Sequence, residues 1–267
     1  MRIGRMASGW CACVALALAA CGDPVQVPQQ SEPLAQFFLA PAANAVGPML
    51  LVSRFEVTRA EYAAETDRSL AELPAVGMTR SEAQAWCAER GLRLPTRIEW
   101  MHLRIAGGQV SREVDRANTL ELNLGKALPV GAIQSGRTGL GGYDFEGNVW
   151  EWLADDAVDG SEQSAFQAGG SFANYRLGPR DAALRQVRPD DRASDVGFRP
   201  VVEALEWLEQ KTLPRWRSAD DEELARMQQA LADWGPELRL ALVRRWRQAY
   251  PQETAFADFL AGDGESE

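Results

Sequence analysis

The segment from Gly142 to Trp152, GYDFEGNVWEW, contains acidic side chains whose spacing suits metal binding. Asp144 and Glu151 supply hard carboxylate oxygens, and Gly147 and Val149 offer backbone carbonyl groups between them. Ligation by oxygen alone at short spacing is typical of calcium, which tolerates irregular coordination geometry. The segment therefore predicts a calcium site at Asp144, Gly147, Val149 and Glu151. A carboxylate pair in an ordinary turn is the alternative.

Cysteine is the second residue type with chemical potential, and the chain has four of them. Two arginines precede an apolar stretch from Trp10 to Ala20, which is the pattern of a secretory signal peptide. The stretch ends in Leu-Ala-Ala-Cys-Gly and resembles a bacterial lipobox, so we expect cleavage before Cys21 and attachment of lipid, such as palmitate, to its thiol. A plain secretory signal with a chance cysteine is the alternative. Cys11 and Cys13 would leave with the signal, and Cys87 would remain without a partner for an internal disulfide.

The predicted lipid anchor places the chain on a membrane of the bacterial cell envelope. In a Gram-negative cell, Gly22 rather than Asp after Cys21 favours the outer membrane, with the chain facing the periplasm. The chain has 28 basic and 38 acidic residues and a net charge of −10. We therefore expect attachment through the lipid rather than through a basic patch, and no nucleic-acid partner. A single histidine excludes multi-histidine metal sites.

The chain divides into four segments. Residues 1–20 form the signal peptide, 21–36 a tether rich in Pro and Gln, 37–201 a globular domain and 202–267 a helical extension. Residues 49–57 are typical of a strand, and residues 109–201, rich in Gly, Asn, Asp and Pro, predict loops with short strands. Three helix starts are predicted by capping-box pairs: Thr58 with Glu61, Thr79 with Glu82, and Thr96 with Glu99.

The extension has helical apolar spacing and four of the nine tryptophans. Ser218 is the predicted cap of one helix, and Pro236 the predicted first residue of another, which Pro251 ends. Short helices cannot bury so much aromatic surface alone. We expect the extension to pack on the globular domain, with packing on a partner as the alternative.

Four segments occur in a fixed order: FEVTRAEY at 55–62, GLRLPTRIEW at 91–100, GYDFEGNVWEW at 142–152, and GGSF at 169–172 leading to GFR at 197–199. Together they resemble the formylglycine-generating enzyme (sulfatase-modifying factor) family over residues 37–201. The resemblance implies an α+β, variant C-type-lectin-like domain with little regular secondary structure and with bound calcium. The family's calcium positions fall on the four residues named above, although the first ligand there is commonly Asn rather than Asp144. Asn118 resembles part of a second family calcium site whose other ligands are not recognisable.

This sequence lacks the cysteines on which the copper chemistry of this family depends. The resemblance implies an enzyme that oxidises a substrate cysteine with copper held by two of its own cysteines, between the GGS and GFR segments. Soft Cu(I) requires thiolate ligands, but residues 172–196 contain no cysteine, and Cys87 lies outside them. We therefore expect no copper and no formylglycine synthesis. Trp150 and Trp152 are predicted core residues, and Arg199 is predicted to close a buried ion pair.

Three functions remain to be compared, and the missing cysteines favour a protein that is not an enzyme. The first is a lipid-anchored pseudoenzyme whose domain binds an envelope protein or a glycan. The second is a periplasmic oxidoreductase of the same family that acts on a small molecule or protein without the copper cysteines. The third, a variable-ligand receptor of the retroelement type, fits poorly because the matching segment has few aromatic residues. The oxidoreductase would use a candidate ligand loop comprising Arg180, Asp181, Arg185, Asp190, Asp191 and Arg192, for which a solvated loop with local ion pairs is the alternative.

Overall fold

A three-stranded antiparallel sheet joins the beginning of the domain to its end. The computed structural model describes residues 33–44, 47–107, 116–156, 164–176 and 184–262. After a short 3-10 helix, η1 (Pro33–Gln36), the strands β1 (Phe37–Ala40), β2 (Leu50–Ser53) and β7 (Val201–Glu203) pair in the order β1-β2-β7. Its register places Leu39 opposite Leu51 and Leu51 opposite Val202. Both faces of β1 are buried, which explains its uninterrupted apolar sequence.

A second sheet carries the GYDFEGNVWEW segment. Its order is β5-β4-β3-β6, and the β3–β6 pair is parallel. The strands are short, as the composition of residues 109–201 predicts. Their bounds are β3 (Trp150–Asp156), β4 (Ala165–Ala168), β5 (Leu184–Val187) and β6 (Val196–Gly197).

All three predicted helix starts are confirmed. Thr58, Thr79 and Thr96 each accept a hydrogen bond from the backbone N–H three residues on, and the glutamate there bonds back to the cap. These caps begin α1 (Arg59–Ala63), α3 (Arg80–Ala88) and α4 (Arg97–Ala106). The remaining short helices of the domain are α2 (Arg68–Ala71), η3 (Leu120–Leu122) and η4 (Gln134–Gly136).

The extension is helical, and one predicted boundary in it is wrong. Asp220, not Ser218, caps α7, because the Asp220 carboxylate accepts the Glu223 N–H at 2.8 Å. Ser218 instead ends the preceding helix and donates to the Pro214 carbonyl. Pro236 begins α8 as expected. The elements are α5 (Ala204–Trp207), the π-helical segment η5 (Leu208–Thr212), α6 (Leu213–Ser218), α7 (Asp221–Ala232), α8 (Pro236–Ala249) and α9 (Thr254–Ala261).

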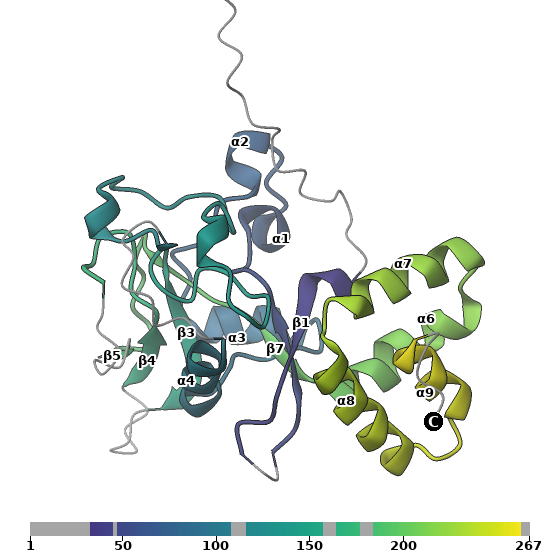
Figure 1. The fold of residues 1–267 in the computed structure, drawn as a ribbon. Coiled ribbons are helices and arrows are strands. Elements are labelled where there is room, and N and C mark those ends of the chain that lie inside the picture. The colour runs from purple at the N-terminus through teal and green to yellow at the C-terminus, as the bar shows by residue number, and fades with distance from the viewer. Residues whose placement is uncertain (1–32, 45–46, 108–115, 157–163, 177–183, 263–267) are drawn as a thin grey trace, which may run out of the picture. The chain divides into compact units, whose positions relative to one another are not determined.

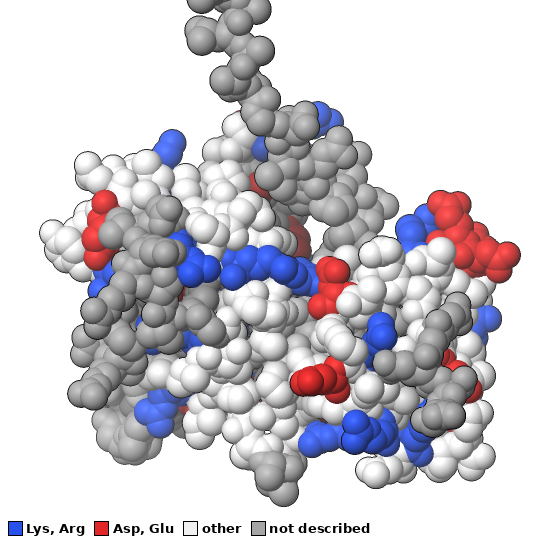
Figure 2. Space-filling view, in the orientation of Figure 1, with Lys and Arg blue, Asp and Glu red and all other residues white. Residues whose placement is uncertain are grey.

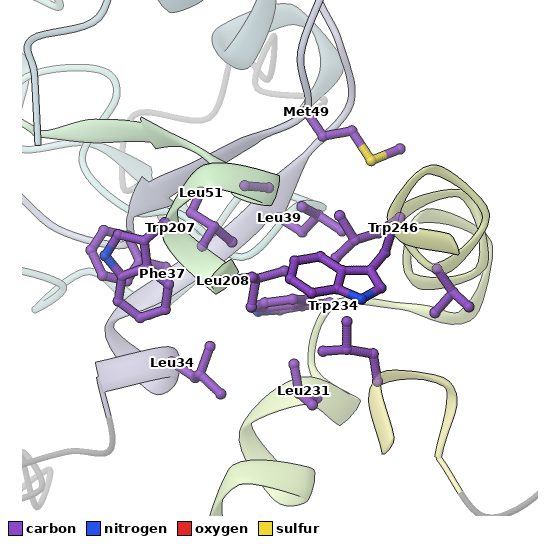
Figure 3. Packing of buried hydrophobic residues seen from close by; sticks show 14 of the residues in the cluster. Leu34, Phe37, Leu39, Met49, Leu51, Trp207, Leu208, Leu231, Trp234 and Trp246 are labelled. Atoms are coloured by element: carbon purple, nitrogen blue, oxygen red, sulfur yellow. The ribbon is translucent and has the colours of Figure 1, made fainter. Parts of the chain in front are cut away.

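The extension packs on the domain, as predicted, and shares a hydrophobic core with the first sheet. Helices α5 to α9 gather beside β1 and η1 (Figure 1). Trp246 and Trp234 contact the same cluster as Leu39 and Leu51 of the sheet (Figure 3). Arg54 adds a polar link, since its guanidinium donates to Asp233 at 3.3 Å. Residues 31–267 therefore form one compact unit.

The surface mixes both signs of charge. On the face shown in Figure 2, basic side chains form a row across the middle of the view, with acidic side chains beside it. In the part of the chain that the structure describes, no helix is both long enough and apolar enough to cross a bilayer. The predicted signal peptide, Cys21 and most of the tether lie outside the described residues.

Candidate functional site

The predicted calcium segment is organised around a buried ion pair. Arg199 and Glu151 have side chains that are 0% and 1% exposed, and the Arg199 Nη2 lies 2.6 Å from the Glu151 Oε1. Glu151 also accepts the Trp100 indole N–H at 2.8 Å. Arg199 donates to the carbonyls of Ser53 and Tyr143, so one guanidinium joins β2 and β3 to the loop before the GNVWEW motif. The prediction that Arg199 closes a buried ion pair is confirmed.

A second pair of carboxylates lies beside this ion pair. Asp144 adopts a left-handed backbone conformation with φ of 58°, and its Oδ2 accepts the Gly131 N–H at 2.6 Å. Burial raises the pKa of Asp144 to about 6. Burial also raises the pKa of Glu56 well above its usual range, and the nearby Asp144 charge adds to this effect. One guanidinium therefore faces three buried carboxyl groups, those of Glu56, Asp144 and Glu151.

The Asn148 side chain forms hydrogen bonds between the segment and residues that are distant in the sequence. It has a φ of 54° and a 1% exposed side chain. Its amide donates to Glu56 Oε1 at 3.1 Å, while its Oδ1 accepts from the Leu128 N–H and from the Asn118 amide. Glu56 and Asn148 are site residues that were not predicted from the sequence. The Gly-Asn pair inside the motif was the available signal, because both residue types favour turns with positive φ.

Of the four predicted calcium positions, Asp144 and Glu151 lie close enough for their charges to interact, but Glu151 is not an open ligand. Gly147, with φ of 78°, cannot be replaced without a clash, since a Cβ there would meet the Asn118 carbonyl. Both Glu151 oxygens are engaged by Arg199 and Trp100 in this conformation. Among the described residues, no group of three or more His, Cys, Asp or Glu side chains is arranged to hold a metal ion. Calcium binding at Asp144, Gly147, Val149 and Glu151 stays a prediction.

One residue of the candidate ligand loop lies against a motif tryptophan. Arg185 of β5 is half-buried and stacks on the Trp150 ring at 4.2 Å, while its Nε donates to Gln167 at 2.7 Å. Desolvation lowers the pKa of Arg185. The Trp150 indole N–H donates to Asn174, whose Oδ1 also accepts the Ser171 hydroxyl. Trp150 and Trp152 are core residues, as predicted.

The other loop residues form local ion pairs. Asp190 pairs with Arg188 at 2.8 Å, and Asp191 accepts the Arg188 backbone N–H. Arg192 instead pairs with Glu82 of α3 at 2.5 Å. The side chains that the structure describes in this loop are thus exposed surface pairs, apart from Arg185. Arg180 and Asp181 lie outside the described residues.

The one cysteine among the described residues is placed unfavourably for binding copper. Cys87 is fully buried in α3 and forms no disulfide. Desolvation raises the pKa of its thiol to about 12, so the thiolate that Cu(I) requires is strongly disfavoured. Cys87 is a small apolar core residue.

Comparison with known proteins agrees with the motifs and the fold. The family described as Sulfatase-modifying factor enzyme 1-like domain matches residues 35–204, and the chain belongs to this family. "Inactive C-alpha-formylglycine-generating enzyme 2" from Mus musculus is 31% identical over 153 residues, which cover 49% of this chain and 50% of that protein. "Formylglycine-generating enzyme" from Mus musculus is 30% identical over 169 residues, which cover 49% of this chain and 45% of that protein. The chain thus spans about half the length of these curated relatives.

The solved structures agree on the fold. PvdO from Pseudomonas aeruginosa superposes with a TM-score of 0.50 at 19% identity, covering 62% of this chain and 90% of that one. At this identity the likeness concerns the fold alone. The chain has an α+β, C-type-lectin-like fold with formylglycine-generating-enzyme-like neighbours, as the resemblance implied.

Proposed function

We propose that this chain is a lipid-anchored envelope protein that binds a protein or glycan partner and does not catalyse formylglycine formation. The observation that carries the proposal is the state of the cysteines. Residues 172–196 contain none, and Cys87 is buried with a thiol pKa of about 12. A relative with a similar match is named as an inactive enzyme.

The polar centre of the domain supports a structural rather than a reactive role. Arg199, Glu151 and Trp100 satisfy one another in a site closed to solvent. The described part of the candidate ligand loop forms surface ion pairs, which neither gather substrate-binding groups nor enclose a substrate. Surface recognition uses the same rigid scaffold without needing such groups.

The first test asks whether the chain retains the family's copper chemistry. The purified chain is incubated with Cu(I), oxygen, a thiol reductant and a cysteine-containing peptide, and the peptide mass is followed. The mouse formylglycine-generating enzyme is the positive control. We expect no aldehyde product and no copper retained after desalting. Product formation with this chain would refute the proposal.

The second test asks whether the chain has a specific partner. The tagged full-length chain is crosslinked in cells, and the captured proteins are identified by mass spectrometry. One dominant envelope protein, also captured when the partner is tagged instead, would support the proposal. Turnover of a small molecule with no specific partner would favour the oxidoreductase, and Arg185 beside Trp150 would be the first residue to change.

A further inference from the structure

A groove with a volume of about 480 Å³ lies between the lectin-like domain and the helical extension. Its apolar surface includes Phe37 of β1, Trp86 of α3 and Trp207 of α5. The Phe37 and Trp207 ring centroids are 5.4 Å apart, and the two side chains lie together in the shared core (Figure 3). Trp86 is half-buried and stacks on Tyr62 with a centroid separation of 6.5 Å. Phe37 and Trp207 are only 6% and 7% exposed, so the half-buried Trp86 ring supplies most of the accessible aromatic surface, and such surfaces are the usual anchors of a binding site.

Three basic side chains line the same groove: Arg90, Lys211 and Arg215. The Arg90 guanidinium lies 4.0 Å from the Trp86 ring centroid and pairs with the exposed Glu89 at 3.3 Å, while Arg215 pairs with Glu223 at 2.6 Å. Lys211 is exposed and makes neither an ion pair nor a hydrogen bond with any residue that the structure describes. An unpaired cation beside apolar rings is notable on a chain with a net charge of −10.

The one acidic residue that lines the groove is already engaged. The Glu61 Oε2 accepts hydrogen bonds from the Thr58 N–H and hydroxyl in the α1 capping box. The Trp86 indole N–H is buried and has no hydrogen-bond partner among the described residues. Among the charged and the buried polar groups that line the groove, those without a partner in the described residues are the Lys211 cation and the Trp86 N–H, and both can bind an anionic ligand.

The backbone at Lys211 is irregular in a way that helps to place the cation. Residues Leu208–Thr212 form a π-helical turn within the helical run from α5 to α6. Pro214 follows, and its ring nitrogen carries no N–H to donate to the preceding turn. Such π turns are rare and frequently occur at functional sites.

We propose that this groove binds an acidic peptide segment of a partner protein, in which carboxylates flank one or two apolar side chains. The apolar side chains pack mainly on Trp86, beside the nearly buried Phe37 and Trp207, and the carboxylates bind Lys211 and displace the exposed Glu89 from Arg90. The proposal rests on the proposed partner-binding function and identifies its surface. The choice of an acidic partner rests on charge complementarity. Most of the surface of this acidic chain repels an acidic peptide, whereas the basic side chains of the groove attract it.

Three labelled octapeptides of equal length test this chemistry by fluorescence anisotropy with the purified full chain: EDEFLEDE, EDESGEDE and KRKFLKRK. We expect only EDEFLEDE to bind. Its affinity should fall about tenfold or more in Lys211→Glu and in Arg90→Glu, and should weaken with salt. Arg226→Glu is the matched control, since Arg226 is an exposed arginine of α7 paired with Glu222 and not a groove residue.

The outcomes separate the groove from other occupants. Equal binding of EDEFLEDE and EDESGEDE, or unchanged affinity in Lys211→Glu, would overturn the proposal. A third result would also overturn it: the chain binds phosphatidylglycerol vesicles but not EDEFLEDE, and Lys211→Glu abolishes the vesicle binding. The groove would then bind lipid. In the cellular crosslinking experiment, Lys211→Glu should lose the dominant partner. If it keeps that partner, the groove inference fails while the partner-binding function stands; if the unsubstituted chain captures none, that function fails.

Discussion

Replacing Arg199 with Met should destabilise the fold more than any surface substitution. The change removes a guanidinium that is fully buried and leaves the Glu151 carboxylate without its counter-charge. It also removes the donors to the Ser53 and Tyr143 carbonyls, at 3.0 and 2.8 Å. Removing one partner of a buried pair costs about 3–5 kcal/mol. Met keeps an unbranched apolar stem but loses the guanidinium that lies 4.3 Å from the Phe145 ring centroid, so most of this loss is electrostatic.

A cost of about 4 kcal/mol is a large share of the roughly 5–15 kcal/mol that stabilises an ordinary domain. For a unit of this size it corresponds to a fall in Tm of roughly 8–16 °C. Urea unfolding followed by tryptophan fluorescence gives the free energy, and calorimetry gives the Tm. The matched control is Arg226→Met, which breaks an exposed i,i+4 pair with Glu222 and should change stability by less than about 0.5 kcal/mol.

Adding Glu151→Gln to Arg199→Met separates charge from packing. Because the double variant no longer leaves the Glu151 carboxylate without its counter-charge, it should be less destabilised than the sum of the two single variants. An Arg199→Met chain within about 1 kcal/mol of the unsubstituted chain would refute the reasoning, since that is the range of an exposed pair. The ion pair would then not be the interaction that holds β2 and β3 together.

Four further predictions concern the anchor, the metal site, the buried thiol and the extension. Cys21→Ala should abolish palmitate labelling and membrane fractionation; persistent labelling would rule out the lipobox. A calcium chelator should lower the Tm of the unsubstituted chain but not of Asp144→Ala, because a ligand bound only to the folded state stabilises it; equal melting curves would remove the predicted site. With a thiol pKa of about 12, Cys87 should be about one part in ten thousand thiolate at pH 8, so iodoacetamide should label it only after unfolding. Ending the chain at Glu203 should give aggregated protein by size-exclusion chromatography, because it exposes Leu39, Leu51 and their neighbours; a soluble monomer with native circular dichroism would show a separable extension.

Local structure was predictable because short-range hydrogen bonds decide it. The three threonine caps need only the residue three positions on, and all three form. The start of α7 was misplaced by two residues because Ser218 and Asp220 are both good capping residues. Asp220 caps it, since its carboxylate reaches the Glu223 N–H, whereas Ser218 is held by the end of the preceding helix.

The polar centre was predictable only in part, because long-range pairing decides it. The sequence shows that Asp144 and Glu151 are acids near one another, and that Arg199 follows an apolar residue. It does not show that Arg199 reaches Glu151 across 48 residues, or that Asn148 contacts Glu56 across 92. These contacts decide whether the carboxylates are free to bind a cation, and neither lies within a single motif.

The helical extension alters which surfaces of the lectin-like domain are accessible. Its tryptophans share one core with β1 and β2. The extension therefore covers a face of the first sheet that would be exposed without it. Covering this face creates a new edge, where Lys211 of the extension approaches Gly91 of the domain so closely that a Cβ added to Gly91 would lie 3.8 Å from the lysine Cε. The groove lies along that edge and takes residues from both parts. Neither part could form this surface alone, so the junction is where the proposed binding function is tested first.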